Sequence, residues 1–316
     1  MKLHIVMYHY VRGGGRYPNI KGLDIEFFRS QIMFLKKNFK IISSEQLFDA
    51  IENGVKIPDN SVLLTFDDGY IDHYTNVFPI LLENKLTALF SMPGKILVER
   101  KMLDVNKIHF VLASSSAATL KDRLFVLLDQ FRGTEFDIPE NRELYEELAI
   151  ANRFDDKDTI FIKRTLQVKL DEQLRGMLVD KLFSEFVGVS EDAFVKELYM
   201  SMDQIKLMKK FGMHFGVHGY DHYWLDSLPA PKMEQDICMA LDVFNGVIDQ
   251  KNWIMCYPYG AYNKNVQHFI KKKHCLAAIT TKIAVASEKD DWLALPRLDA
   301  NDYPPKSDNY LQYLGV

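Results

Sequence analysis

The chain has 316 residues, of which 47% are hydrophobic and 26% are charged, a composition typical of a soluble globular protein with a substantial core. Its 39 basic and 43 acidic residues give a net charge of −4, so we expect no nucleic-acid partner. The apolar runs are too short to cross a bilayer, so no transmembrane segment is expected. Because no signal-peptide pattern opens the chain and the three cysteines lack metal-type spacing, we predict a cytoplasmic protein with reduced thiols.

Short apolar strands alternate with amphipathic helical segments, which is typical of parallel β/α architecture. Helices are predicted at residues 25–39, 44–53 and 76–85. Ser43 and Gln46 have the spacing of a capping box for the second of these helices, and Gly54 follows its end. The seven predicted strands cover residues 3–9, 61–66, 87–92, 213–218, 253–258, 276–281 and 293–298.

Residues 100–199 carry no strand pattern and are rich in Leu, Lys, Glu, Asp and Phe at helical spacing. We therefore expect a helical insertion at 100–199 within an α/β domain made of residues 1–99 and 200–316. A substrate lid, a dimer contact and plain scaffolding are all compatible with this pattern. The predicted helices of the insertion cover residues 106–114, 117–131, 140–152, 157–167, 171–187 and 190–197.

Two adjacent carboxylates follow the strand predicted at residues 61–66. Asp67 and Asp68 come directly after its apolar run, and Gly69 comes next. Parallel α/β folds bind their ligands at the carboxyl ends of strands, so one acid could bind a metal ion while the other accepts a proton from water. A solvated Asp-Gly turn is the alternative interpretation.

Two histidines with metal-ligand spacing follow the strand predicted at residues 213–218. His218 and His222 are four residues apart, so we expect both imidazoles on one side of a helical turn, within reach of one divalent ion. Two imidazoles and one carboxylate suit zinc, although nickel, cobalt or iron could replace it. Three protein ligands leave coordination positions open for water and substrate, as in catalytic zinc sites. The alternative interpretation is that the two histidines are an ordinary pair on the protein surface.

A turn rich in aromatic residues follows the strand predicted at residues 253–258. Pro258 and Gly260 predict a tight turn that can aim a backbone N–H at an oxyanion. The flat rings of Tyr257, Tyr259 and Tyr262 could contact a sugar. Taken alone, the segment is equally compatible with a turn that carries surface aromatics.

Together, these three segments resemble the motifs of the NodB-homology polysaccharide deacetylases. The matching segments are Thr65–Gly69, His218–His222 and Tyr257–Gly260, and they occur in the order typical of that family. The resemblance covers residues 1–99 and 200–300 and leaves the helical insertion outside. It implies a distorted (β/α) barrel of about seven strands, in agreement with the number of strands predicted above.

The resemblance also implies a reaction and a set of site residues. Asp67 would be the general base, and Asp68, His218 and His222 would hold the divalent metal. Tyr259 would contribute its backbone N–H to an oxyanion hole. The implied reaction is metal-dependent hydrolysis of an N-acetyl group on an amino sugar, which releases acetate.

Two residues complete the expected site, and both are expected to contact the substrate. They are Tyr257, in the third motif, and Tyr70, which directly follows the first motif.

The chain departs from the family pattern at two positions. Many family members carry an arginine just before the third motif that orients the base, but none precedes Tyr257 here. We expect Arg297 to replace it by pairing with Asp67 and keeping it ionised, although a salt bridge elsewhere is the alternative. The final histidine that many relatives use as general acid is also missing, so His9 is the best remaining candidate and Asp299 a weaker one.

Three functions fit this sequence. The first is N-deacetylation of a nucleotide-linked or lipid-linked amino sugar, or of a glycan intermediate, in surface-polysaccharide assembly. The second is hydrolysis of another small amide, such as a formamide or a cyclic ureide. The third is carbohydrate binding by a catalytically impaired relative, which the missing arginine and histidine would explain. The oligomeric state cannot be predicted from these features.

Overall fold

The computed structural model describes residues 2–313 and divides the chain into two compact units. The first unit contains the residues up to Gly13, Gly22–Arg100 and the residues from Lys196 onward. The second contains Gly14–Lys21 and Lys101–Val195. The chain therefore leaves the first unit after Arg100 and returns to it at Lys196.

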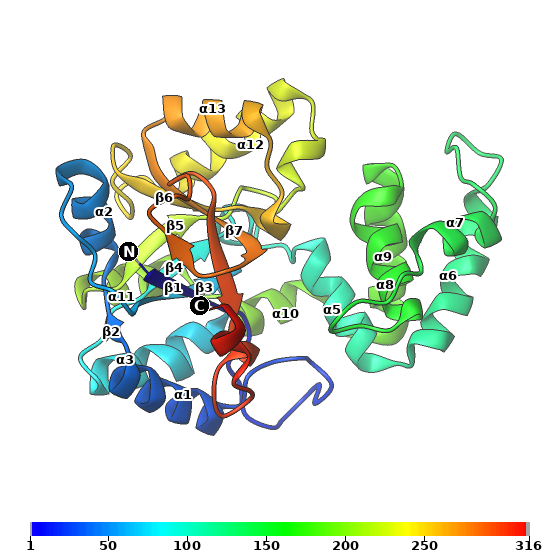
Figure 1. Cartoon of the computed structure of the whole chain (residues 1–316). Helices are drawn as coiled ribbons and strands as arrows, with labels where there is room; N and C mark the ends of the chain where they lie inside the picture. The colour runs from blue at the N-terminus through cyan, green and yellow to red at the C-terminus, as the bar shows by residue number, and fades with distance from the viewer. Residues whose placement is uncertain (1, 314–316) are drawn as a thin grey trace. The chain divides into compact units, whose positions relative to one another are not determined.

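The first unit is built around a closed barrel of parallel strands (Figure 1). The order around the barrel is β1, β3, β4, β5, β6, β7 and β9, and β9 pairs with β1 to close the ring. The predicted (β/α) barrel is therefore confirmed. Its strands are β1 (Lys2–Tyr8), β3 (Ser61–Asp67), β4 (Leu89–Met92), β5 (His214–Val217), β6 (Trp253–Cys256), β7 (Cys275–Ile283) and β9 (Leu295–Asp299).

Two short strands and a set of helices surround this barrel. β2 (Lys40–Ile41) pairs with β3 in parallel, and β8 (Ala286–Ser287) pairs with β1 in antiparallel. The α-helices are α1 (Ile25–Asn38), α2 (Ser44–Asn53), α3 (Phe78–Glu83), α4 (Lys95–Val98), α11 (Met202–Lys210), α12 (Ala230–Val243) and α13 (Lys264–Lys272). The shorter turns are the π-helical segment His73–Val77 and the 3₁₀ segments Leu225–Ser227, Pro258–Gly260, Ala300–Asp302 and Asn309–Tyr313.

Local sequence signals fix the ends of several helices. The Ser43 side chain accepts a hydrogen bond from the Gln46 N–H, and the Gln46 side chain bonds back to the Ser43 backbone, so the predicted capping box is present. Gly54 ends α2 in the left-handed conformation with φ of 66°. The same reciprocal cap, between Ser201 and Gln204, begins α11.

The interior of the barrel is a packed apolar core. Because strand side chains alternate between two faces, every second residue of each barrel strand points inward. The buried side chains that meet there include Leu3, Ile5, Leu63, Leu89, Ile254, Cys256, Ala277, Ile279 and Leu295. This apolar core fills the barrel below the carboxyl ends of the strands. Polar side chains that point inward are therefore expected at the next inward positions, at the carboxyl ends themselves.

The second unit is helical. Its helices are α5 (Asp104–Ser114), α6 (Ala117–Phe131), α7 (Asn141–Leu148), α8 (Lys157–Arg164) and α9 (Glu172–Phe186), with a π-helical segment at Thr165–Lys169. Helix α10 (Glu191–Leu198) carries the chain back to the first unit. Leucines buried on α6 and α9, such as Leu124 and Leu178, lie in the apolar interior of the second unit. Ion pairs at the surface, such as Arg123 with Glu185, add only small stabilisation.

The predicted helices and strands agree with observed ones to within a few residues at each end, whereas α4, α11, α12, α13, β2 and β8 were not predicted. Between Arg100 and Met200, all the regular elements are helices, as expected from the leucine and charge pattern. No helix in residues 2–313 is both long enough and apolar enough to span a membrane.

The acid stability of the barrel should depend on His4. Burial, followed by the charge of Lys2, lowers the pKa of His4 to about 4, whereas an unfolded chain takes up this proton near pH 6.5. The free energy of unfolding should therefore fall as the pH drops from 6.5 to 4, by about 3 kcal/mol from this group. Urea unfolding across this range should show a shallower slope for His4→Gln than for the wild type.

The exposed His268 on α13 offers a matched control. His268→Gln makes the same substitution at the protein surface and should keep the wild-type dependence of stability on pH. An equal slope for His4→Gln and the wild type would show that His4 does not contribute to acid sensitivity.

Candidate active site

Alternation along β3 and β9 aims two charged side chains into the barrel. Leu63 and Leu295 belong to the interior core, and Asp67 and Arg297 lie four and two residues further along the same strands. Both therefore point to the same interior as these leucines, at the carboxyl ends of the strands. Both are almost fully buried, with exposed fractions of 0% and 2%.

Asp67 and Arg297 form a buried ion pair. An Nη2 atom of Arg297 lies 2.6 Å from Oδ2 of Asp67, so the pairing predicted from the sequence is present. Arg297 also donates from Nε to the carbonyl of Thr280 at 2.8 Å, which fixes its orientation. Burial alone would raise the pKa of Asp67, but the charge of Arg297 and then that of His218 hold it below its ordinary value.

A left-handed turn reverses the direction of the chain directly after Asp67. Asp68 has φ of 74° and Gly69 has φ of 72°, a conformation that non-glycine residues rarely adopt. The turn brings the Asp68 carboxylate to the same buried end of the barrel, with an exposed fraction of 2%. A backbone hydrogen bond of 3.0 Å from the Met200 N–H to the Gly69 carbonyl holds this turn in place.

The segment that carries His218 and His222 is an irregular loop, so the predicted helical turn is wrong. Gly219 has φ of 70° and His222 has φ of 57°, neither of which is helical. The carboxylate of Asp236, on α12, accepts hydrogen bonds of 2.9 Å from the N–H groups of Tyr220 and Asp221. These bonds satisfy backbone donors that a helix would use itself. A side chain at position 219 would collide with Asp236, since an added Cβ lies 2.9 Å from its Oδ2.

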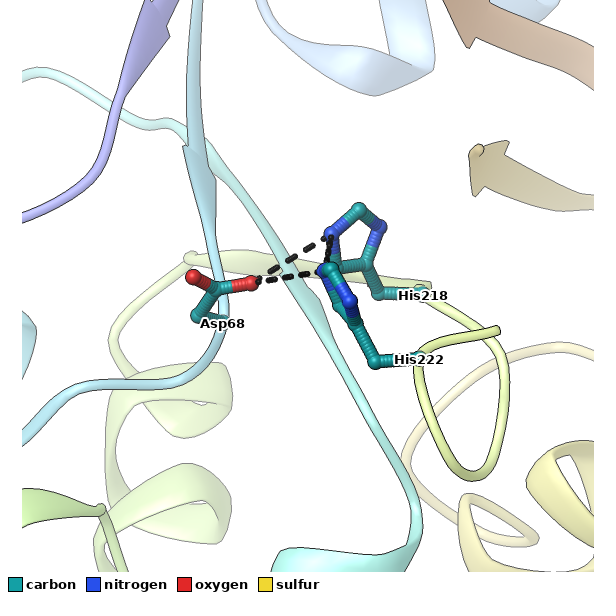
Figure 2. A group of neighbouring side chains, drawn as sticks. All are labelled: Asp68, His218 and His222. Atoms are coloured by element: carbon teal, nitrogen blue, oxygen red, sulfur yellow. Dashed lines mark hydrogen bonds and ion pairs between the residues drawn. The ribbon is translucent and has the colours of Figure 1, made fainter. Parts of the chain in front are cut away.

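The loop nevertheless brings both imidazoles to Asp68. Oδ1 of Asp68 lies 3.4 Å from Nε2 of His218 and 3.3 Å from Nε2 of His222, and the two Nε2 atoms are 3.1 Å apart. Figure 2 shows the carboxylate at the end of its strand facing both rings. Within residues 2–313, this is the one group of three or more acidic, histidine or cysteine ligands close enough to share a metal ion.

Hydrogen bonding fixes the protonation of His218. Its Nδ1 lies 2.6 Å from the carbonyl oxygen of Cys256, which can only accept, so Nδ1 carries the proton and Nε2 offers a lone pair. Burial would lower the pKa of His218, but the charge of Asp67 and the nearby Asp68 carboxylate raise it. Burial dominates at His222 and lowers its pKa. Burial also opposes ionisation of Asp68, yet the two imidazoles hold the pKa of Asp68 well below its ordinary value.

This group of three fits a divalent transition metal. Zinc bonds of about 2.0–2.1 Å at tetrahedral angles hold two ligand atoms about 3.3 Å apart, and the three separations here range from 3.1 to 3.4 Å. Oδ1 of Asp68 is buried and has no hydrogen-bond partner among residues 2–313. Three protein ligands leave further positions open for water and substrate, as catalytic metal sites do.

The third motif forms a tight turn beside His222. Tyr259 has φ of 58°, and its ring contacts that of His222 edge-on with centroids 4.6 Å apart. Gly260 has φ of 73°, and a Cβ at this position would collide with Thr281, so only glycine fits. The indole of Trp224 stacks on the Tyr259 ring, with the centroids 4.6 Å apart.

Tyr257 and Tyr70 do not fit the substrate-contacting role expected from the sequence. Both side chains have exposed fractions of 0%. The Tyr257 ring stacks on Tyr262, and its hydroxyl donates to the carbonyl of Leu293 at 2.9 Å. Tyr70 donates its hydroxyl to Oδ2 of Asp68 at 2.5 Å. Each follows a strand end, but its ring is packed among other residues and is not exposed to a substrate, which the order of residues did not reveal.

His9 lies near the two carboxylates and is only partly buried. It follows β1 directly, and its positive charge would lower the pKa of both Asp67 and Asp68. Its backbone carbonyl accepts a hydrogen bond of 2.9 Å from Nε2 of His73, a buried histidine. Asp299, the weaker candidate for a general acid, is engaged instead in capping the turn at Ala300–Asp302.

The sequence did not reveal the residues that hold the loop His218–His222 in place. Asp236 carried no signal, because a lone acid on an amphipathic helix predicts only a solvated face. Lys95 forms an ion pair of 2.6 Å with Asp221, and its backbone N–H donates to the Tyr220 carbonyl at 3.0 Å. Trp224, two residues after His222, could have been noticed as an aromatic neighbour of the second motif.

Comparison with known proteins places this geometry in a family. A family model described as "Polysaccharide deacetylase" matches residues 54–111 and 150–276, which is more than half of the chain. The chain belongs to the polysaccharide deacetylase family. The matched ranges include Asp67, Asp68 and both histidines, whereas Arg297 lies beyond them.

Two curated relatives share shorter segments. The chain is 39% identical over 67 residues to the poly-beta-1,6-N-acetyl-D-glucosamine N-deacetylase of Escherichia coli (strain K12), covering 21% of this chain and 10% of that protein. It is 30% identical over 100 residues to the putative polysaccharide deacetylase YxkH of Bacillus subtilis (strain 168), covering 32% of this chain and 36% of that protein. The chain therefore matches only a small part of each relative's length.

Two solved structures share the fold over nearly the full length. The deacetylase PplD of Streptococcus pyogenes, solved in complex with acetate, has a TM-score of 0.62 at 16% identity and covers 100% of this chain and 99% of that chain. IcaB from Ammonifex degensii has a TM-score of 0.59 at 17% identity and covers 98% and 97%. At these identities the likeness establishes the fold.

Removing Arg297 should destabilise the barrel strongly. Arg297→Ala would leave the Asp67 carboxylate buried without a partner, which typically costs about 3–5 kcal/mol of unfolding free energy. Adding Asp67→Asn should recover part of this loss, because the amide leaves no unpaired charge. Urea unfolding of the metal-free protein gives both values.

An exposed pair on α7 offers the control. Arg142 lies 2.8 Å from Glu146, with side-chain exposures of 87% and 63%, so Arg142→Ala should cost less than about 1 kcal/mol. Equal stability of Arg297→Ala and Arg142→Ala would contradict a structural role for the buried pair.

Proposed function

We propose that this protein is a metal-dependent hydrolase that removes an N-acetyl group from an amino sugar in a glycan or glycan precursor. The convergence of Asp68, His218 and His222 on one point, next to the Asp67–Arg297 pair, supports this proposal above all. Family membership supports the reaction class. The name of the Escherichia coli relative supports N-acetylglucosamine as the sugar.

Asp68, His218 and His222 would hold the metal, with zinc as the first candidate and cobalt, nickel or iron as alternatives. A divalent ion bound there supplies Lewis-acid chemistry, because it lowers the pKa of water and polarises an amide carbonyl. Asp67 accepts the proton that the attacking water loses. Arg297 keeps that carboxylate ionised and fixes its direction, at a separation of 2.6 Å.

Two further residues complete the proposed chemistry. The left-handed turn at Tyr259 places the backbone of the third motif beside His222, where the Tyr259 N–H would donate to the oxyanion. His9 would donate a proton to the departing amine, because its imidazole is partly exposed and lies near both carboxylates. Trp224 and Tyr259 both remain partly exposed, which suits contact with a sugar ring.

The substrate would be an N-acetylated amino sugar in the assembly of a surface polysaccharide. Three classes of substrate can be tested: a nucleotide-linked sugar, a lipid-linked sugar and a short β-1,6-linked oligosaccharide of N-acetylglucosamine. The cytoplasmic location stays a prediction from the sequence, and fractionation of cells that produce the protein would test it.

Acetate release should depend on both the metal and Asp67. We expect the zinc- or cobalt-loaded protein to release acetate from at least one of the three substrate classes, and to lose this activity with a chelator and regain it with metal. Asp67→Asn should lower kcat by about 100- to 10,000-fold, since a positioned general base contributes that much. Enzymatic measurement of acetate gives the rates.

Two controls make this result specific. Zinc content of Asp67→Asn should equal that of the wild type, because Asp67 pairs with Arg297 and is not among the three proposed ligands. Asp49→Asn, at a helical position on α2, should leave the rate unchanged. The proposal fails if the metal-loaded wild type releases no acetate from any class, or if Asp67→Asn retains full turnover.

His9→Gln tests the proposed general acid. We expect kcat to fall about 100-fold, because the departing amine needs a proton, while the dissociation constant for zinc changes less than threefold. His268→Gln is the matched control on an exposed helix. A His9→Gln enzyme with kcat within threefold of the wild type would show that another group donates the proton.

A further inference from the structure

The two oxygens of Asp68 have different surroundings. Oδ1 faces the Nε2 atoms of His218 and His222 at 3.4 and 3.3 Å. Oδ2 accepts a hydrogen bond of 2.5 Å from the hydroxyl of Tyr70. This division of the carboxylate leaves a single oxygen directed at the point where the three proposed ligands converge.

Stacked aromatic rings hold Tyr70 in place. Its ring lies against that of Tyr10, with centroids 3.9 Å apart and planes 21° apart, and parallel to that of Tyr199 at 6.3 Å. His73 contacts it edge-on at 5.6 Å. Rings packed in this way have little freedom, so the core fixes the position of the Tyr70 hydroxyl oxygen beside Asp68.

The backbone on both sides of Tyr70 is also held. Tyr70 forms an isolated antiparallel bridge with Tyr199, and its carbonyl accepts a hydrogen bond of 3.0 Å from the His73 N–H. Together with the Met200–Gly69 bond, these contacts fix the turn that carries Asp68. A donor mounted on this frame can fix the rotation of the carboxylate, which has only two side-chain torsions.

We propose that Tyr70 is a positioning residue that makes Asp68 a one-oxygen metal ligand, with Oδ1 toward the two imidazoles and Oδ2 retained by the tyrosine hydroxyl. Partners of this kind orient metal ligands and strengthen metal binding. A carboxylate without this restraint can turn and bind through both oxygens, which fills a position needed by water or substrate. The inference rests on the proposed metal site and extends it to a residue outside the three ligands.

The test is Tyr70→Phe, which removes the hydroxyl and keeps the stacked ring. We expect its dissociation constant for zinc, measured by competition with a chromophoric chelator, to rise about 10- to 100-fold. We also expect the visible absorption spectrum of the cobalt-loaded variant to differ from that of the wild type, because the coordination of the ion changes. A purely structural role for Tyr70 would not alter that spectrum.

Tyr8→Phe is the matched control. Tyr8 is a buried tyrosine of β1 whose ring also stacks, on Phe66, and whose hydroxyl has no hydrogen-bond partner among residues 2–313. Tyr8→Phe should therefore have the same zinc affinity and the same cobalt spectrum as the wild type. Changes of equal size in Tyr8→Phe and Tyr70→Phe would overturn the assignment, because they would reflect loss of any buried hydroxyl.

The outcomes separate this inference from the proposed function. A wild-type protein that binds no zinc would overturn the metal site and the positioning role together. Wild-type binding with an unchanged affinity and spectrum in Tyr70→Phe would overturn the positioning role alone. If Tyr70→Phe does not fold, the zinc-bound wild-type crystal structure decides: ligation by Oδ1 alone, with the Tyr70 hydroxyl on Oδ2, supports the proposal, and ligation by both oxygens overturns it.

Discussion

The buried ion pair between Asp67 and Arg297 is the constraint on which the rest of the site depends. Two charges can leave water only if they meet in good geometry, and here the separation is 2.6 Å. That contact requires β3 and β9 to deliver the two side chains into the same interior, which happens because β1 pairs with both strands and closes the ring. The pair also sets the electrostatics next to it, since the charge of Asp67 raises the pKa of His218.

The loops that carry the proposed metal ligands are tied to the segments through which the chain leaves and re-enters the barrel unit. Just before the chain leaves at Arg100, the Gly94 N–H donates to the Gly219 carbonyl at 3.1 Å. Just after its return at Lys196, the Met200 N–H donates to the Gly69 carbonyl at 3.0 Å. The barrel segments on either side of the insertion are therefore both hydrogen-bonded to the loops that carry the proposed metal ligands.

The predictions that succeeded were those set by local pattern. Strand runs, helical periodicity and the Ser43 cap depend on neighbours in the sequence, and the structure has them. The errors concerned direction. A helical turn was expected between His218 and His222, but the Asp236 carboxylate accepts hydrogen bonds from backbone N–H groups of that loop. Tyr257 was expected to face a sugar, yet its ring is fully buried and its hydroxyl donates to the Leu293 carbonyl.

The sequence by itself determined the barrel class, the family motifs and the residues proposed for the chemistry. These features depend on the alternation of strands with helices and on the residues at strand ends, which are local patterns in the sequence. Only the tertiary structure decided which atoms meet. Arg297 could be named as a partner for Asp67, but the two lie 230 positions apart in the sequence, and closure of the barrel alone brings them together. Tyr70 shows the same limit: its residue type suggested a substrate contact, whereas the left-handed turn at Asp68 and the stacked rings direct its hydroxyl to the carboxylate.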